Sequence, residues 1–271
     1  MTVTPEILMV DNIGRVRVLT LNRPDKANSF NERLYHTTAD AIAAAAADES
    51  VSVVVVTGAG RVFSGGVDIT EMTRAIPDDE SADNAGAGAP APRSSDMSRG
   101  FDAFVDGLQS FPKPLVAAVN GAAVGIGFTM LLHCDLVILS EHARLRAPFT
   151  RMGVAPEAAS SYLLPRRVGR QQAALALFTS DWIPPQDAVD SGLAIKVVAP
   201  DRLLAEAVEL GTRIAEHPLP SLMATKRLVI DAERVGILRA RELEGQEFAA
   251  LLKLPNARDR VVAQLDKTAP A

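Results

Sequence analysis

Apolar residues along the chain fall into short runs that are typical of buried β-strands. Residues 51–57 and 115–119 are almost continuous apolar runs, and residues 136–139 form a third. Such runs suit strands that are buried on both faces, as in a parallel sheet. Residues 16–21 instead alternate between apolar and polar side chains, which predicts a half-buried strand.

Helical patterns separate these strands and continue toward the C-terminus. Asn31 is a suitable N-cap for a helix that runs to about Ala47. Beyond Pro184 the pattern is helical except for a short strand at residues 195–198, and Gly192 lies where a helix C-cap would. Strands that alternate with helices predict an α/β fold. The C-terminal helices are expected at residues 202–215, 222–232, 238–252 and 257–265.

Residues 77–97 differ from the rest of the chain. They are rich in Asp, Ala, Gly, Pro and Ser, which predicts a mobile surface loop between helices at residues 68–76 and 98–111. The helical tail has too little apolar core to form a domain of its own. We therefore expect a single domain, with its core in residues 1–200 and a C-terminal helical oligomerisation region in residues 201–271.

Composition narrows the possible partners. The 271 residues carry a net charge of −5 with mixed signs, which gives no reason to expect nucleic acid or an anionic membrane as a partner. The single Cys134 fits a reducing compartment, and no apolar run is long enough to span a membrane. No stretch near the N-terminus combines the basic and apolar regions of a signal peptide. We expect a cytoplasmic protein without a metal site.

Two glycine-rich turns are candidates for a catalytic site made of main-chain N–H groups. Each follows an apolar strand and leads into a helix, the first at residues 51–69 and the second at residues 115–132. The first N–H groups of a helix have no intrahelical acceptor, and the helix dipole favours negative charge there. The N–H groups of Val67 and Ile126 are therefore candidate donors of an oxyanion hole.

Other interpretations of these turns remain open. Both can be strand-to-helix turns that simply need glycine. A dinucleotide-binding fingerprint is a weaker alternative, because its third glycine is replaced by Met130 in one turn and by Phe63 in the other.

Three motifs in this order resemble the crotonase superfamily of enoyl-CoA hydratases and isomerases. They are N-R-P-D-K-A-N-S-F at residues 22–30, F-S-G-G-V-D-I at residues 63–69 and A-V-N-G-A-A-V-G-I-G at residues 118–127. The resemblance implies a Clp protease/crotonase-like spiral of ββα units and a coenzyme A (CoA) thioester substrate. It also implies a homo-oligomer, either a trimer or a dimer of trimers. No cofactor is expected, since CoA is part of the substrate.

The resemblance also assigns substrate-binding residues. Val67 and Ile126 would donate their N–H groups to the thioester carbonyl. Arg23 and Lys26 could meet the CoA phosphates, although a solvated basic turn explains them as well. Ala27 matches a position at the adenosine end of the substrate. The remaining candidates around the thioester are Ser64, Gly65, Gly66, Asp68 and Ile69, and Asp68 can equally be a helix cap.

The acid/base residues depart from the hydratase pattern. Hydratases that resemble this chain carry two catalytic Glu residues, which correspond here to Thr129 and Phe149. Neither can exchange a proton with water. Hydration by the two-carboxylate route is therefore not expected.

A different carboxylate is available at Glu157. Residues 147–165 resemble the Δ3,Δ2-enoyl-CoA isomerases, in which the Glu of a P-E pair is the base. Pro156 suits the first turn of a helix, which would place Glu157 near a helix N-terminus. Apolar neighbours such as Phe149 and Met152 could raise its pKa. The alternative is a solvated acid that complements the helix dipole.

The expected function is an isomerase of fatty-acid β-oxidation that moves the double bond of a 3-enoyl-CoA to give a 2-enoyl-CoA, with Glu157 as its one base. The alternatives are an enoyl-CoA hydratase, another crotonase-type reaction, or a non-catalytic homologue that only binds acyl-CoA.

Overall fold

The computed structural model describes residues 6–75 and 96–263. Its main sheet has six strands in the order β1-β2-β3-β5-β7-β9. The first pair is an antiparallel hairpin, and every later neighbour is parallel. The strands are β1 Leu8–Ile13, β2 Val16–Leu21, β3 Val53–Gly58, β5 Leu115–Val119, β7 Leu136–Ser140 and β9 Lys196–Val198.

A second, smaller sheet is parallel, and its strands alternate along the chain with those of the main sheet. It consists of β4 Val62–Ser64, β6 Ala122–Val124 and β8 Arg144–Arg146 in that order. Each of these strands follows a strand of the main sheet and leads toward a helix. The helices are α2 Ile69–Ala75, α5 Ile126–Thr129 and α6 Phe149–Met152. This succession of ββα units confirms the expected crotonase-like α/β spiral.

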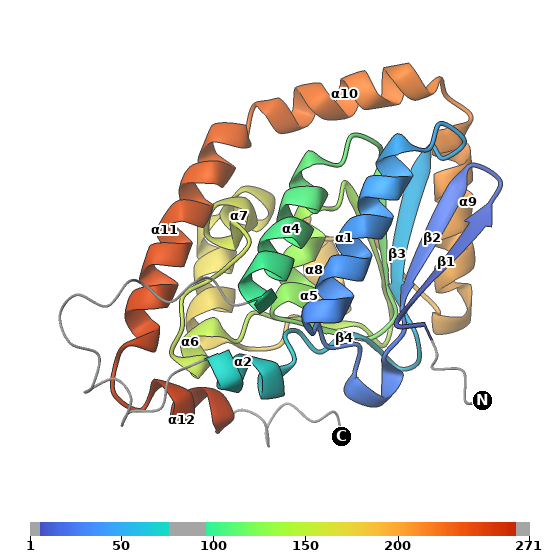
Figure 1. Ribbon diagram of the computed structural model, residues 1–271. Helices are drawn as coiled ribbons and strands as arrows, with labels where there is room; N and C mark the ends of the chain where they lie inside the picture. The colour runs from blue at the N-terminus through green and yellow to red at the C-terminus, as the bar shows by residue number, and fades with distance from the viewer. Residues whose placement is uncertain (1–5, 76–95, 264–271) are drawn as a thin grey trace.

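Helices cover both faces of the main sheet (Figure 1). Alternate residues of a strand point to opposite faces. Val54 and Val56 accordingly join the core under α1 Glu32–Ala47 and α4 Asp96–Ser110, whereas Val53 and Val55 pack with α9 Leu203–Ala215. The predicted cap of α1 is confirmed, because Asn31 Oδ1 accepts a 2.9 Å hydrogen bond from Leu34 N–H.

The C-terminal helices wrap around the body. Figure 1 shows α10 crossing one end of the molecule and α11 descending beside α7. The last helix, α12, contacts α2. The bounds are α7 Ser160–Thr179, α8 Pro185–Asp190, α10 Leu219–Asp231, α11 Arg234–Leu252 and α12 Ala257–Val262, with 3-10 turns η1 Pro24–Lys26, η2 Met130–His133 and η3 Pro200–Arg202.

Most of the predicted elements are confirmed, but one predicted loop and several strands differ. Residues 77–95 of the predicted loop lie outside the described residues. Residues 96 and 97 begin helix α4, so the loop prediction is wrong for these two residues. The sequence interpretation also missed β1 and the three strands of the small sheet. The division into residues 1–200 and 201–271 stays a prediction, although α9 of the second part covers the sheet.

Candidate active site

The two glycine turns meet at the small sheet. Its strands β4 and β6 are neighbours, and each is followed by a glycine with positive φ, +93° at Gly66 and +54° at Gly125. A Cβ atom added to Gly66 would lie 3.7 Å from the Cα atom of Gly125 and 2.8 Å from the main-chain oxygen of Val124. Only glycine allows this approach. Val67 and Ile126, which follow the two glycines, are therefore brought close together.

Both candidate oxyanion donors have a free N–H group. Among the described residues, no acceptor binds the main-chain N–H of Val67 or of Ile126. Phe30 fixes the first of them, because its N–H donates to Gly66 O over 2.7 Å and its oxygen accepts from Asp68 N–H over 2.8 Å. Two free, neighbouring main-chain donors are the arrangement that stabilises a developing oxyanion.

Ser64 and Gly65 connect this turn to residues 27–29. Ser64 Oγ is buried, donates to Asn28 O over 3.0 Å and accepts from Gly66 N–H over 3.2 Å. Gly65 N–H donates to Ala27 O over 2.7 Å. These contacts give Ser64 a structural role in the free protein.

Asn28 is a supporting residue that the sequence interpretation missed. It is fully buried with a left-handed backbone, φ +53°. Its side-chain amide donates to Ala59 O and Val62 O over 2.9 and 2.7 Å. Its position inside the first family-like motif was the available signal.

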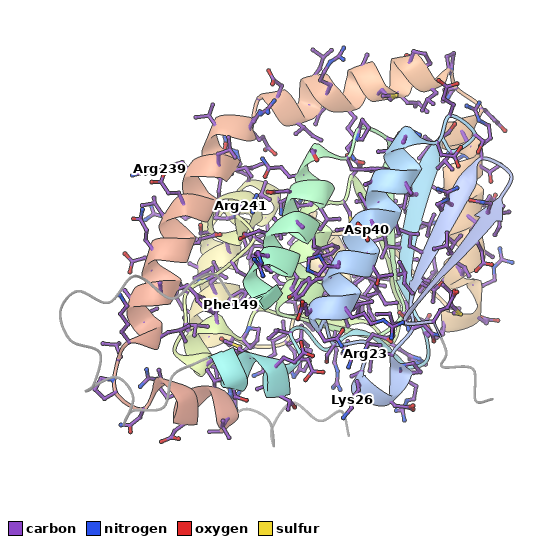
Figure 2. The ribbon with its side chains drawn as sticks, in the orientation of Figure 1. Arg23, Lys26, Asp40, Phe149, Arg239 and Arg241 are labelled. Carbon is purple, nitrogen blue, oxygen red and sulfur yellow. The ribbon has the colours of Figure 1, made fainter. Side chains whose placement is uncertain are left out.

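The residues expected at the CoA end lie together (Figure 2). Arg23 is partly buried, and its guanidinium binds Ser29 O and, over 3.1 Å, the carboxylate of Asp68. Lys26 is exposed, and Ala27 follows it with a left-handed backbone. Asp68 thus pairs with Arg23 immediately before Ile69, the first residue of α2. Of the two cations, Lys26 is the freer one.

Glu157 lies in a turn and not in a helix, so the expected helix start at Pro156 is wrong. Helix α7 begins only at Ser160. Ala158 and Ala159 have φ values of +56° and +58°, and these left-handed conformations interrupt any right-handed helix. Glu157 is the first residue of this turn, because its main-chain oxygen accepts a 3.0 Å hydrogen bond from Ser160 N–H.

The surroundings of Glu157 favour its neutral form. Burial and, secondarily, the negative charge of Glu244 raise the pKa of Glu157 to about 8. Phe149 and Met152, the apolar neighbours expected from the sequence, are buried in the main hydrophobic core. A carboxyl group with a pKa near working pH can both accept and return a proton.

Tyr35 packs beside the oxyanion turn. Its ring centroid lies 4.9 Å from that of Phe30, the residue paired with Val67. Burial raises the pKa of Tyr35 well above its usual value, and the nearby charges of Glu157 and Glu71 add to the effect. Tyr35 therefore packs against the residue paired with Val67 and lies within electrostatic range of Glu157.

The two hydratase positions hold no ionisable group. Thr129 is fully buried, and its hydroxyl has no hydrogen-bond partner among the described residues. Phe149 is buried at the start of α6. Neither residue can serve as the acid or base of a two-carboxylate site.

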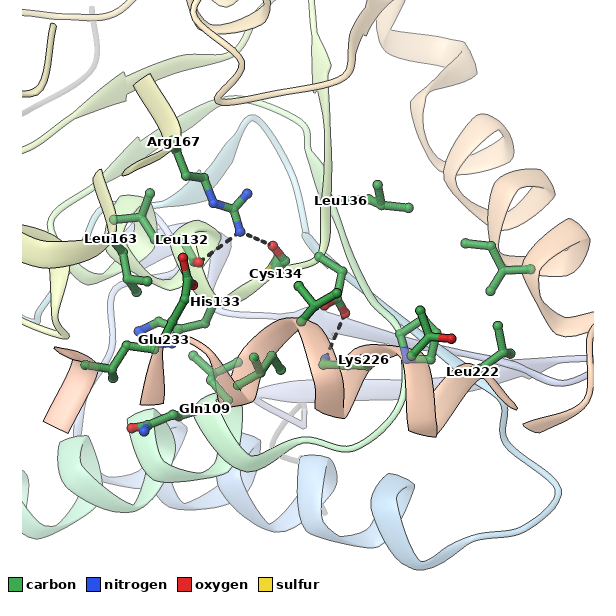
Figure 3. Close-up of a pocket in the computed structure, with 18 residues that line it drawn as sticks. Gln109, Leu132, His133, Cys134, Leu136, Leu163, Arg167, Leu222, Lys226 and Glu233 are labelled. Carbon is green, nitrogen blue, oxygen red and sulfur yellow. Dashed lines mark hydrogen bonds and ion pairs between the residues drawn. The ribbon is translucent and has the colours of Figure 1, made fainter. Parts of the chain in front are cut away.

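Two hollows lie near these elements. The first, of about 410 Å³, lies beneath α10 and is lined by His133 and by Lys226, which pairs with Asp135 (Figure 3). The second, of about 490 Å³, lies between α7 and α11 and includes Glu244. Neither hollow includes Glu157, Val67 or Ile126.

The described part of the chain holds neither a metal-binding cluster nor a helix that could span a membrane. No cluster of three or more His, Cys, Asp or Glu residues there could hold a metal ion. No helix in the same residues combines the length and apolarity needed to cross a membrane.

Comparison with known proteins shows the family of this chain. The family model described as "Enoyl-CoA hydratase/isomerase" matches residues 12–268. The chain is 33% identical over 263 residues to the 2,3-dehydroadipyl-CoA hydratase of Escherichia coli, covering 97% of each protein. It is 32% identical over 255 residues to the enoyl-CoA delta isomerase 2 of Rattus norvegicus, covering 90% of this chain and 62% of that protein.

A solved enoyl-CoA hydratase/isomerase from Pseudoalteromonas atlantica has the same fold. It superimposes with a TM-score of 0.84 at 33% identity, covering 98% of this chain and 99% of that one. Together with the family match over nearly the whole chain, this shows that the protein belongs to the enoyl-CoA hydratase/isomerase family of the crotonase superfamily.

Proposed function

We propose that the protein converts a 3-enoyl-CoA to the conjugated 2-enoyl-CoA by moving one proton. The observation that carries the proposal is the environment of Glu157, a carboxyl group whose burial and neighbour Glu244 raise its pKa to about 8. Family membership supports an acyl-CoA substrate. The rat relative named as an enoyl-CoA delta isomerase supports the reaction type.

The chemistry requires a single proton carrier. The carboxylate of Glu157 removes a proton from carbon 2, and the electron pair moves onto the thioester oxygen as a dienolate. The N–H groups of Val67 and Ile126 stabilise that oxygen. The carboxylic acid then returns its proton to carbon 4, which leaves the double bond between carbons 2 and 3. This route uses no cofactor besides the CoA of the substrate.

A hydratase is the competing function, because a relative carries that name. Hydration by two carboxylates needs a second free acid beside Glu157. The nearby Glu244 does not supply it, since both of its oxygens accept main-chain hydrogen bonds, from Ala159 and Ser161. The buried, apolar Phe149 also limits access of water to the intermediate.

Other features of the proposal concern binding and assembly. Lys26 is exposed and available to the CoA phosphates, whereas Arg23 must first exchange its contact with Asp68. A role in β-oxidation, a cytoplasmic location and a trimer or dimer of trimers stay predictions.

The test offers purified protein a 3-enoyl-CoA and a 2-enoyl-CoA separately, and follows conjugation and hydration. We expect conjugation of the first and little hydration of the second. Glu157→Gln should abolish conjugation and retain CoA-thioester binding, measured by calorimetry. Glu209→Gln, the same change on an exposed residue of α9, is the control and should keep full activity.

Three outcomes would contradict the proposal. Fast hydration without any conjugation would favour the hydratase. Conjugation that is unaffected by Glu157→Gln would remove the proposed base. Binding without any turnover would indicate a non-catalytic acyl-CoA-binding protein.

A further inference from the structure

The turn that carries Glu157 has an unfavourable backbone. Ala158 and Ala159 follow Glu157 directly, have φ values of +56° and +58°, and are buried. Residues with a Cβ atom avoid this conformation because the Cβ atom crowds the carbonyl oxygen. Two in succession persist only where surrounding contacts hold them. The conformation of the turn is therefore imposed from outside.

Glu244 of α11 supplies two of these contacts. Its Oε2 accepts a 2.7 Å hydrogen bond from Ala159 N–H, and its Oε1 accepts a 2.8 Å hydrogen bond from Ser161 N–H. Glu244 is only 6% exposed. Both N–H groups lie at the start of α7, where no intrahelical acceptor exists. One carboxylate thus holds the main chain on both sides of Ser160.

His133 of η2 holds the same turn from the other side. Its Nε2 lies 2.8 Å from Ala158 O. Since a carbonyl oxygen can only accept, Nε2 carries the hydrogen. Burial lowers the pKa of His133 to about 4, so the ring is neutral in neutral solution and this tautomer is retained. The turn is therefore held between η2 and α11.

Helix α11 is itself attached to the body near Glu244. Arg241, three residues earlier, pairs with Asp102 and Asp106 of α4 and donates to Gln109. Tyr162 of α7 crowds Gly236 of α11, where an added Cβ atom would meet the Tyr162 ring at 2.2 Å. These contacts fix α11, and hence Glu244, relative to the turn.

We propose that Glu244 is a positioning residue for proton transfer, which aims the Glu157 carboxyl by holding the main chain at Ala159 and Ser161. This inference rests on the proposed function, because it assumes that Glu157 is the base. A mere helix cap would accept the same hydrogen bonds and stabilise the fold, but its loss would leave kcat unchanged. The two roles can therefore be separated by experiment.

The charge of Glu244 gives a second readout besides kcat. The Glu244 carboxylate adds to burial in raising the pKa of Glu157, so its neutralisation should shift the Glu157 titration downward. Burial raises the pKa of Glu244, and its hydrogen bonds to Ser161 and Ala159 oppose that rise. The titratable and charged groups around the turn and Glu244 are Tyr35 of α1, His133 of η2, Tyr162 of α7, and Arg239, Arg241 and Glu247 of α11.

The experiment compares Glu244→Gln, Glu244→Asp and the wild type. Glutamine has one acceptor oxygen for two N–H groups, so kcat should fall roughly 10- to 100-fold with little change in KM. The pH midpoint of kcat/KM should move to lower pH. Aspartate keeps the charge and both oxygens, so Glu244→Asp should hold the midpoint near that of the wild type. Glu242→Gln, an exposed change on the same helix, is the matched control.

A second measurement needs no substrate. The titration of Glu157 is read from the pH dependence of the difference in unfolding free energy between the wild type and Glu157→Gln, with and without Glu244→Gln. A downward shift establishes the coupling of Glu244 to Glu157 without an enzyme assay, so a failure of the proposed function can be told apart from a failure of this inference. If Glu244→Gln lowers only the melting temperature, with unchanged kcat and titration, Glu244 is a structural cap and the inference is overturned.

Discussion

Gly66 and Gly125 lie against each other at the edge where β4 and β6 pair. A Cβ atom added to Gly66 would come within 3.7 Å of Gly125 Cα. The next residue in each segment, Val67 or Ile126, has an N–H group with no acceptor among the described residues. The close approach of two glycines from separate ββα units thus explains how two main-chain donors can share one oxygen.

Replacing Gly66 should therefore damage catalysis more than folding. In Gly66→Ala, the new Cβ atom would lie 2.8 Å from Val124 O at a φ of +93°, which forces the Val67 N–H away. We expect kcat to fall about 10²- to 10³-fold, the effect of losing one oxyanion donor. Steady-state kinetics measure it. Gly14→Ala, at φ +58° with no atom within 4 Å, is the control and should keep kcat.

The pH dependence of the reaction should report the Glu157 carboxyl. Its pKa in the free protein is raised to about 8, and only the ionised form can remove the first proton. We expect kcat/KM to rise tenfold per pH unit below about pH 8 and to level off above it. A profile already flat from pH 6 upward would show that Glu157 is not the titrating base.

Glu157 should also lower stability at high pH. Below about pH 4 the carboxyl is protonated in both folded and unfolded chains, so it contributes nothing. As the pH rises toward about 8, the unfolded chain ionises first and is favoured. We expect Glu157→Gln to raise the melting temperature, increasingly between pH 5 and pH 9 as judged by calorimetry. An equal effect at both ends would contradict the raised pKa.

Lys226 should anchor α10 to the body. Its side chain is 4% exposed, and its ammonium group donates to Lys113 O and to the Asp135 carboxylate, both over 2.8 Å. Lys226→Met should lower the free energy of unfolding by about 2–3 kcal/mol, because hydrogen bonds to charged groups are lost. Urea denaturation measures this. Lys253→Met, an exposed change after α11, should cost less than about 0.5 kcal/mol.

The elements that were predicted well are those with a strong local pattern. Residues 115–119 match β5 because a strand buried on both faces needs only a run of apolar residues. Asn31 predicted the start of α1 because an N-cap acts within three residues. The strands of the small sheet have three residues each, which is too few to show a period.

Some features of the candidate site could be predicted from local sequence, and others could not. The glycines and Glu157 stood out in the sequence, and the absence of carboxylates at Thr129 and Phe149 needed no structure. The expected helix start at Pro156 failed because contacts from Glu244, 85 residues beyond Ala159, hold the turn in a left-handed form. No local pattern contains that information.

By itself, the sequence determined the alternation of strands and helices, the two glycine turns and the residue types available for proton transfer. Only the tertiary structure decided that Gly66 lies against Gly125 and that Glu157 lies beside two residues with left-handed backbones. It also decided that Glu244 binds the main chain of this turn and raises the pKa of Glu157. The physical reason is the distance along the chain over which each interaction acts. Backbone propensity and capping act over a few residues, whereas the direction and pKa of a buried carboxyl depend on groups that packing brings from distant parts of the chain.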